Sequence, residues 1–338
     1  MLSGGMTHYD RTIGTILITL VLYVLQIFIS RITKYRDALY FLTFLPSLFL
    51  LLMLTDVDGS FDETRFSGMT IIPIILFLCC IVYMIFFRKK KSLAASEIDG
   101  NLFGMLWKNL FPLSITFIFI SLAGNSNKVF HYRLRMESLL SQGEYAKALE
   151  VGRNSSSTDS NLTMLRAYAL SRTKQLGNSL FEFPIKGKSD ALLPNGNDVK
   201  CMLLPSGEIF KQLGVRKKGS MGTMEYLLYL EKNGLAMKSV ADYVLCGYLL
   251  DKNLDRFVDF IRYKYNLSSP SLPKHYKEAL TLYTHLRANP VVVFHSEVMD
   301  ADYADFQKLE QEHNNKILRY SFIKDSYGDT YWFYYFFG

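Results

Sequence analysis

The chain has 338 residues, of which 49% are hydrophobic, 14% aromatic and 20% charged, and its formal net charge is +7. This composition, with only four cysteines, excludes a disordered chain, a collagen-like chain and a disulfide scaffold. The long apolar runs are concentrated before Lys128, whereas the rest of the chain is charged and rich in tyrosine. This asymmetry argues against a purely cytosolic protein and predicts a membrane part followed by a soluble part.

Four stretches without any charged side chain predict membrane-spanning helices, at residues 12–30, 38–55, 66–87 and 109–127. A helix needs about 20 predominantly apolar residues to cross the hydrocarbon core, and all four stretches fall within the usual range of about 17–25. Three of them contain a proline, which membrane helices tolerate when neighbouring groups satisfy the freed carbonyls. We therefore predict that residues 1–127 form a transmembrane domain of four helices.

Cationic side chains are distributed unequally between the linkers of these spans. The linkers after the first and third spans hold eight Lys and Arg, whereas the N-terminus and the linker after the second span hold two. Because cytoplasmic loops are enriched in Lys and Arg, this bias predicts that both termini lie outside the cytoplasm. We expect a multi-pass protein of the inner membrane with periplasmic N- and C-termini, for which the lipid bilayer is one partner.

Residues 128–338 show short amphipathic helical segments separated by turn residues. Around Gly143, Tyr145 and Ala148 the chain resembles the tetratricopeptide repeat (TPR), whose pattern has a glycine, an aromatic residue two positions later and an alanine three further on. Gly177 follows Gly143 by 34 residues, which is the repeat period of that family. We therefore predict an all-α fold, in which a TPR-like helical-repeat domain (an α-solenoid) of residues 128–338 lies outside the cytoplasm.

Apolar spacing predicts further helices in this domain. They cover Met224–Lys232 paired with Met237–Leu250, Leu254–Tyr265 paired with His275–Arg287, and Asp302–Tyr320. A segment rich in glycine and proline, residues 183–223, interrupts the repeats. We interpret it as an insertion that forms either a binding face or a variable surface connection.

The stretch Tyr331–Gly338 is aromatic at seven of its eight positions, and such rings are costly to leave in water. Two interpretations remain, a cap on the exposed apolar end of the last repeat and an anchor at the membrane interface. We favour the cap, because a solenoid end must be covered and the sequence predicts no other capping helix.

Four stretches together carry a resemblance to a known family. They are Leu176–Gly177 before Phe181–Pro184, Tyr243–Phe260, Leu272–Tyr276 and Tyr327–Trp332. With the order of the two parts of the chain, they are similar to a family of integral membrane proteins of Bacteroidota. That family has N-terminal transmembrane helices and a C-terminal TPR-like region. The resemblance implies the location and the fold, and it implies no activity.

The sequence contains no catalytic, cofactor-binding or metal-binding motif. Its six histidines form no His-Glu-x-x-His pair and no CxxC accompanies them, so we assign no catalytic, cofactor or metal residue and expect no cofactor. Cys201 and Cys246 fall in the region predicted to be periplasmic, where a disulfide persists. We favour two unpaired core thiols, because solitary cysteines in apolar surroundings are usually buried and free.

The segment 56–63 is unusually acidic, with Asp56, Asp58, Asp62 and Glu63 around a glycine. Carboxylates in such a loop bind hard cations, although the spacing does not match the twelve-residue calcium loop. We favour a solvated acidic loop outside the cytoplasm. The alternative is a glycosyltransferase-like membrane enzyme that acts on a lipid-linked substrate with these carboxylates.

These observations favour an interaction protein over an enzyme. Stacked helix pairs form a concave surface that binds peptides or other proteins, so we expect an envelope protein or a peptide as partner. Candidate polar contacts are Arg166, Arg172, Lys174 and the cluster Arg216–Lys218. The basic residues are spread along the chain rather than gathered in one stripe, so we expect no nucleic-acid partner.

Overall fold

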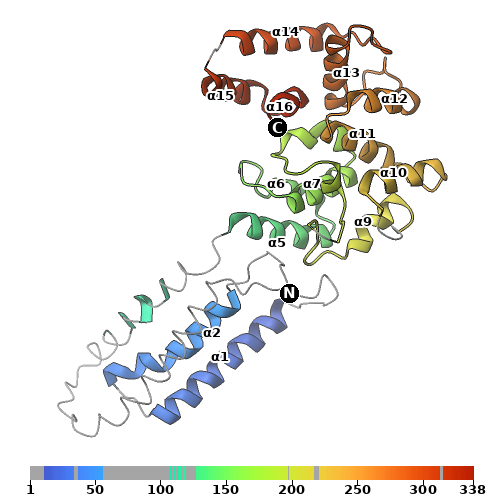
Figure 1. Cartoon of the computed structure of the whole chain (residues 1–338). Helices are drawn as coiled ribbons and strands as arrows, with labels where there is room; N and C mark the ends of the chain where they lie inside the picture. The colour runs from blue at the N-terminus through green and yellow to red at the C-terminus, as the bar shows by residue number, and fades with distance from the viewer. Residues whose placement is uncertain are drawn as a thin grey trace. The chain divides into compact units, whose positions relative to one another are not determined.

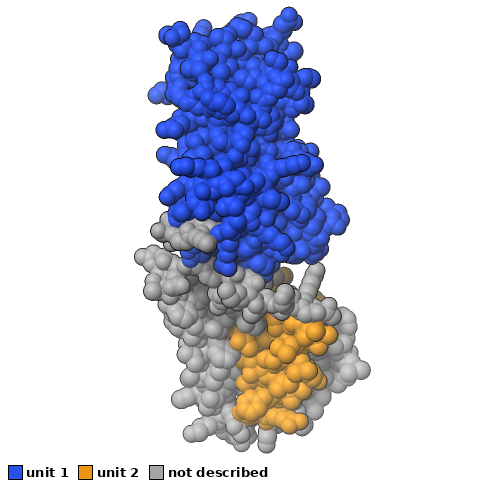
Figure 2. All heavy atoms as spheres, turned by 90° about the vertical axis from the view of Figure 1, so that its right-hand side faces the viewer, with its two compact units in different colours: residues 1–8, 131–338 blue, residues 9–130 orange. Residues whose placement is uncertain are grey.

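The structure is a computed structural model of the chain. It describes residues 11–33, 37–55, 107, 110–111, 113–115, 117–118, 127–196, 198–216, 221–312 and 315–338. Two compact units are distinguished, one that contains His131–Gly338 and one that comprises Tyr9–Phe130, and Figure 2 colours them separately. Throughout the described ranges every regular element is an α-helix or a 3-10 helix, so the all-α prediction is confirmed (Figure 1).

The unit that comprises Tyr9–Phe130 begins with the apolar helix α1 (Arg11–Thr33). Its segment Ile13–Ile32 has 20 residues and a mean hydropathy of 2.3, and few of its side chains are buried within the protein. By length and composition this helix is able to cross a membrane. The 3-10 helix η1 (Asp37–Phe44) and the helix α2 (Leu45–Thr55) follow, and both pack against α1.

Among the described residues, only α1 has the length and composition of a membrane span. The predicted span 38–55 is divided between η1 and α2, and its apolar helical run, Tyr40–Leu51, is short for a span. Pro46 is the second residue of α2, and because proline has no N–H, the ladder of backbone hydrogen bonds cannot run unbroken through this point. The predicted span 66–87 and most of the span 109–127 lie outside the described residues.

The unit that contains His131–Gly338 is a succession of short helices joined by turns and loops (Figure 1). They are α5 (Lys128–Ser141), α6 (Tyr145–Glu150), α7 (Ser160–Arg172), α8 (Leu176–Ser179), η3 (Leu180–Glu182), η4 (Ser189–Leu192), α9 (Ser206–Leu213), α10 (Thr223–Lys232), α11 (Val240–Leu250), α12 (Leu254–Lys264), α13 (Lys274–Leu286), α14 (Glu297–Glu312), α15 (Lys316–Tyr327) and α16 (Tyr331–Phe337). Helices α10 to α13 agree with the predicted ranges to within a few residues. Helix α12 buries one face at helical spacing, whereas α11 and α13 are buried on most sides.

Four helix ends in this unit share one backbone geometry. Gly143, Lys174, Gly234 and Lys252 all have left-handed φ angles, between 56° and 77°. The N–H of the next residue bonds back to a carbonyl five residues earlier, at 3.0, 2.8, 3.0 and 2.9 Å respectively. This is the Schellman ending, which stops a helix and reverses the chain into the next one. Gly143 lies in the turn between α5 and α6, and the corresponding turn between α7 and α8 is therefore at Lys174.

The predicted 34-residue spacing between Gly143 and Gly177 therefore does not connect equivalent positions. Gly177 lies inside α8, where it is buried against α13. A Cβ atom at this position would lie 2.6 Å from Cζ of the Tyr276 ring, which is too close for two carbon atoms. The glycine is thus required for the close approach of two helices and not for a turn.

Of the segment predicted as an insertion, residues 183–223, the structure describes 183–196, 198–216 and 221–223, and these parts are packed into the unit. It contains η4 and α9, and several of its leucines are fully buried. Glu137 on α5 anchors it, because its Oε2 accepts hydrogen bonds from three consecutive backbone N–H groups at 2.6 to 2.9 Å. Burial raises the pKa of this carboxyl group.

The C-terminal part differs from its prediction in one respect. The range Asp302–Tyr320, predicted as one helix, is shared by α14 and α15. Asn315 caps the N-terminus of α15, since its side chain accepts a hydrogen bond from the Ile317 N–H at 2.9 Å, and such a cap starts a new helix. The aromatic stretch then forms α16, which packs against α13 and α15.

Candidate functional site

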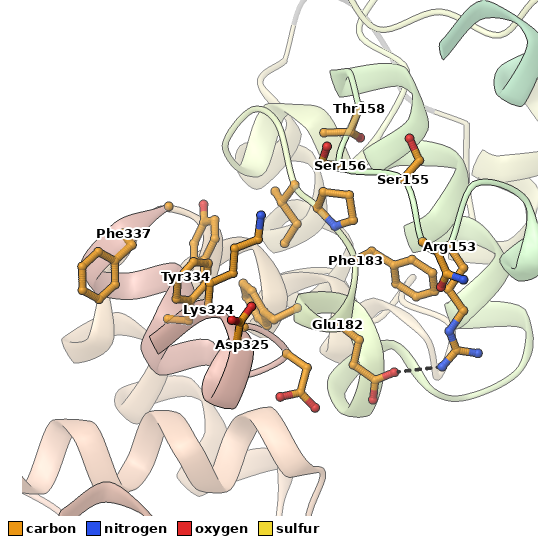
Figure 3. Close-up of a pocket in the computed structure, with 18 of the residues that line it drawn as sticks. Arg153, Ser155, Ser156, Thr158, Glu182, Phe183, Lys324, Asp325, Tyr334 and Phe337 are labelled. Atoms are coloured by element: carbon orange, nitrogen blue, oxygen red, sulfur yellow. Dashed lines mark ion pairs between the residues drawn. The ribbon is translucent and has the colours of Figure 1, made fainter. Parts of the chain in front are cut away.

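An open cleft of about 620 Å³ is the candidate functional site of the unit that contains His131–Gly338. One side is formed by the loop 153–158 between α6 and α7 together with the segment 181–185, which is the floor of the cleft, and the other side is formed by α15 and α16. Figure 3 labels Arg153, Ser155, Ser156, Thr158, Glu182 and Phe183 on the first side and Lys324, Asp325, Tyr334 and Phe337 on the second. The fold thus gathers three distant parts of the sequence around one hollow.

The loop 153–158 is fixed at both of its ends. Gly152 has φ +64°, and a Cβ there would lie 2.9 Å from a neighbouring tyrosine ring, so the turn before the loop requires glycine. Arg153 forms ion pairs with Glu150 at 3.1 Å and Glu182 at 3.6 Å. Asp159 ends the loop as the N-cap of α7. The serine-rich stretch between these anchors lines the cleft.

Arg166 lies beneath the cleft and connects its loop to its floor. The side chain is almost completely buried, and its Nη1 donates hydrogen bonds to Thr158 Oγ1 at 3.2 Å and to the Pro184 carbonyl at 3.0 Å. Its guanidinium group also lies 5.2 Å from the centre of the Phe183 ring. Burial lowers the pKa of Arg166 to about 10, which leaves it charged at neutral pH. Arg166 is therefore a positioning residue for the cleft.

The second side of the cleft is attached to the floor through edge-to-face and tilted contacts between rings. The ring of Phe181 has its centre 5.1 Å from that of His275, 5.0 Å from that of Tyr331 and 4.9 Å from that of Tyr334. The Tyr334 hydroxyl donates to the Leu250 carbonyl at 2.8 Å, at the C-terminal end of α11. These contacts hold α16 against η3, so this wall of the cleft is preorganised.

The rim of the cleft carries charges of both signs. Lys274 pairs with Asp329 at 2.9 Å, and this hydrogen bond helps to raise the pKa of Lys274 against the opposing effect of burial. The Lys324 ammonium group lies 5.8 Å from the centre of the Tyr320 ring. Within the part of the chain that the structure describes, neither Lys324 nor Asp325 has an ion-pair partner. The rim therefore offers a cation and an anion to a ligand.

Of the residues predicted from the sequence to make polar contacts, and among those that the structure describes, only Arg166 is connected to the cleft, where it supports lining residues from below as a buried residue. Arg172 is exposed and stacks on the Tyr145 ring at 4.9 Å, and Lys174 occupies a left-handed turn. Arg216 is exposed and does not line the cleft, and residues 217–218 lie outside the described residues.

Sequence reasoning missed the loop 153–158 and the pair Lys324 and Asp325. The run of three serines did mark a loop by its composition, but a loop signal does not tell which element lies opposite. The sequence predicts that the aromatic stretch is a cap. Its role as a wall of the cleft depends on its contact with Phe181, which no local sequence pattern predicts.

The sequence also raised two further questions, a disulfide between the two soluble-part cysteines and a cation site in the acidic segment. Cys201 and Cys246 are both free thiols, and burial raises the pKa of each. The acidic segment 56–63 lies outside the described residues. In the described ranges no group of three or more His, Cys, Asp or Glu side chains is arranged to hold a metal ion.

Comparison with known proteins places the chain in a family. Residues 61–241 and 229–338 match the model of DUF6057, a family of unknown function. Since these matches cover well over half of the chain, the protein belongs to this family. A comparison with curated proteins and one with solved structures gave no match.

Proposed function

We propose that this member of the DUF6057 family is a membrane-anchored helical-repeat protein that acts as an interaction scaffold or adaptor on the periplasmic side of the inner membrane. In this proposal the N-terminal part is a multi-pass anchor and residues 128–338 are a TPR-like domain. The helix α1 and the charge-free stretches support the anchor, and the excess of cations after the first and third stretches supports periplasmic termini.

The topology is tested with a reporter that is active only in the cytoplasm. Fused after Lys91 the reporter works, and fused after Gly338 it fails. The opposite pattern contradicts the periplasmic placement of residues 128–338.

The proposed binding role rests on the cleft. It is open, its walls are held in place by internal contacts, and aromatic rings alternate around it with charges of both signs. Aromatic side chains and arginine are enriched where proteins bind one another, and stacked helices present concave surfaces to extended partners. We infer that a partner protein docks in this cleft.

Site-directed photo-crosslinking in the native cells tests this proposal. A photoreactive amino acid at Ser156, which is exposed and lines the cleft, yields one discrete crosslinked protein. The same amino acid at Met237, which is exposed and lies away from the cleft, does not. Equal crosslinking at both positions, or none at Ser156, contradicts the scaffold. Replacing Asp58 by Asn leaves the crosslink unchanged, because the acidic segment of the enzyme alternative has no part in docking.

A further inference from the structure

The segment 183–186 at the floor of the cleft forms neither a helix nor a strand of a sheet. Its first residue has φ −102° and ψ 149°. The Pro184 carbonyl accepts from Arg166 at 3.0 Å, and the Lys186 N–H donates to Thr163 Oγ1 at 3.1 Å. The Lys186 carbonyl in turn accepts from the same hydroxyl at 3.1 Å. The residues on both sides of position 185 therefore direct their backbone polar groups towards α7.

Ile185 is the residue between them, and it lines the cleft. The C=O and N–H of one trans peptide group point in opposite directions, so the Ile185 N–H points away from the side of the Pro184 C=O, and the Ile185 C=O away from that of the Lys186 N–H. Both groups of Ile185 therefore point away from α7. Throughout the described ranges neither group has a hydrogen-bond partner. Ile185 thus presents a donor and an acceptor side by side, as a residue on the open edge of a sheet does.

We propose that the cleft binds an extended segment of a partner polypeptide, which pairs strand-like with both backbone groups of Ile185. This inference rests on the proposed function and specifies how the partner is held. One residue of the partner exchanges two hydrogen bonds with Ile185, as opposed residues of an antiparallel ladder do. Its neighbours reach the rings of Tyr334 and Phe337, and charged flanking residues meet Lys324 and Asp325.

Because the proposed pairing uses backbone groups, substitutions can distinguish it from binding by side chains. Ile185→Pro removes the N–H donor, and proline suits an extended position that follows another proline. Ile185→Ala is the matched control, because it removes most of the side chain and keeps both backbone groups. Lys324→Ala is a third variant that alters the opposite rim at an exposed position.

The probe is a library of random linear peptides of about twelve residues, selected on the full chain in detergent. Fluorescence anisotropy then gives the affinity of the selected peptides for each variant. We expect binding to Ile185→Pro to be weaker by about tenfold, as the loss of a well-formed hydrogen bond implies, while Ile185→Ala binds within about threefold of the original chain. Hydrogen exchange of the Ile185 amide in the unmodified chain slows when peptide is bound.

Several outcomes overturn the inference. The first is a library from which no peptide binds the full chain, and the second is peptide binding that leaves the exchange of the Ile185 amide unchanged. The third is equal affinity for Ile185→Pro and the original chain. If such peptides still lose affinity for Lys324→Ala, the cleft binds its partner without strand pairing, and the proposed function stands while the inference fails. The amide exchange decides the matter even if Ile185→Pro does not fold.

Discussion

His275 Nδ1 lies 2.9 Å from Glu278 Oε2 on the same face of α13, and both side chains are buried. His275 Nε2 accepts a hydrogen bond from the Phe181 N–H at 3.2 Å, so Nδ1 carries the proton and donates to the carboxylate. The same carboxylate oxygen accepts from the Tyr331 N–H at 2.7 Å. One buried glutamate therefore connects η3, α13 and α16, the elements that hold the aromatic wall of the cleft.

Replacing Glu278 by Ala should lower the free energy of unfolding of the fragment 128–338 by about 2–5 kcal/mol. The substitution leaves two buried donors without an acceptor, and each costs about 1–3 kcal/mol. Glu278→Gln should cost less, since its amide oxygen still accepts. Urea unfolding measures both, with Glu144→Ala at an exposed carboxylate as the control. An unchanged midpoint for Glu278→Ala would show that the network contributes nothing.

Trp332 should be among the most sensitive positions of α16. Its side chain is 1% exposed, and its indole N–H donates to the Glu278 carbonyl at 2.8 Å. Truncating a buried tryptophan to alanine costs about 3–5 kcal/mol. Phe336, which is 39% exposed, is the control, and its replacement by Ala should cost less than half as much. Thermal unfolding of the two variants gives the comparison.

Deleting residues 331–338 tests the whole helix as a cap. Without them the core around Phe181 and Tyr303 is exposed, so the fragment should aggregate or lose its cooperative unfolding transition. A truncated fragment that melts as cooperatively and at the same temperature as the intact one would assign the stretch to another role.

Gly177 and Gly207 offer a matched pair of helical glycines. Gly177→Ala places a methyl group against the fully buried Tyr276 ring and should destabilise by about 1–3 kcal/mol, as overpacking does. Nothing lies within 4 Å of a Cβ atom at Gly207, so Gly207→Ala should be neutral or stabilise by up to about 1 kcal/mol. Chemical denaturation distinguishes the two, and equal effects would contradict the close approach of α8 and α13.

The ion pair between Asp255 and Arg287 should make stability depend on pH. Arg287 donates to both carboxylate oxygens of Asp255 at 3.0 and 2.7 Å, and these hydrogen bonds lower the pKa of Asp255. A lowered pKa in the folded state gives stability that is present above the ordinary value of 3.8 and is lost as the pH falls through the folded pKa. Because both groups are partly exposed, the contribution is about 0.2–1 kcal/mol.

Asp255→Asn isolates this contribution. The variant should be less stable than the original fragment at pH 7, and the difference should be smaller at pH 3, which lies below the ordinary pKa of 3.8. Urea unfolding at the two pH values measures the difference. A gap of the same size at pH 3 would mean that packing, rather than the charge, is responsible.

The sequence by itself determined the elements whose pattern is local. The charge-free stretch 12–30 predicted α1, and apolar side chains at helical spacing placed α10 to α13. This signal is local, because residues three and four apart lie on the same side of a helix. The aromatic character of Tyr331–Gly338 indicated a buried segment, since rings at successive positions have no stable place in water. Gly143 indicated a turn, because glycine adopts the left-handed backbone without steric cost.

Only the tertiary structure decided the features that depend on distant contacts. Lys174 adopts a left-handed backbone, which costs a non-glycine residue about 1–2 kcal/mol, because the packing of α7 against α8 outweighs this cost. No sequence pattern predicts the turn at this residue. The sequence predicts Arg166 as a polar contact for a partner, yet it is buried, and the loop and the floor of the cleft supply the acceptors for its guanidinium group. The cleft exists because α16 returns to Phe181, and a contact between segments so far apart in the sequence is set by the packing of the whole unit.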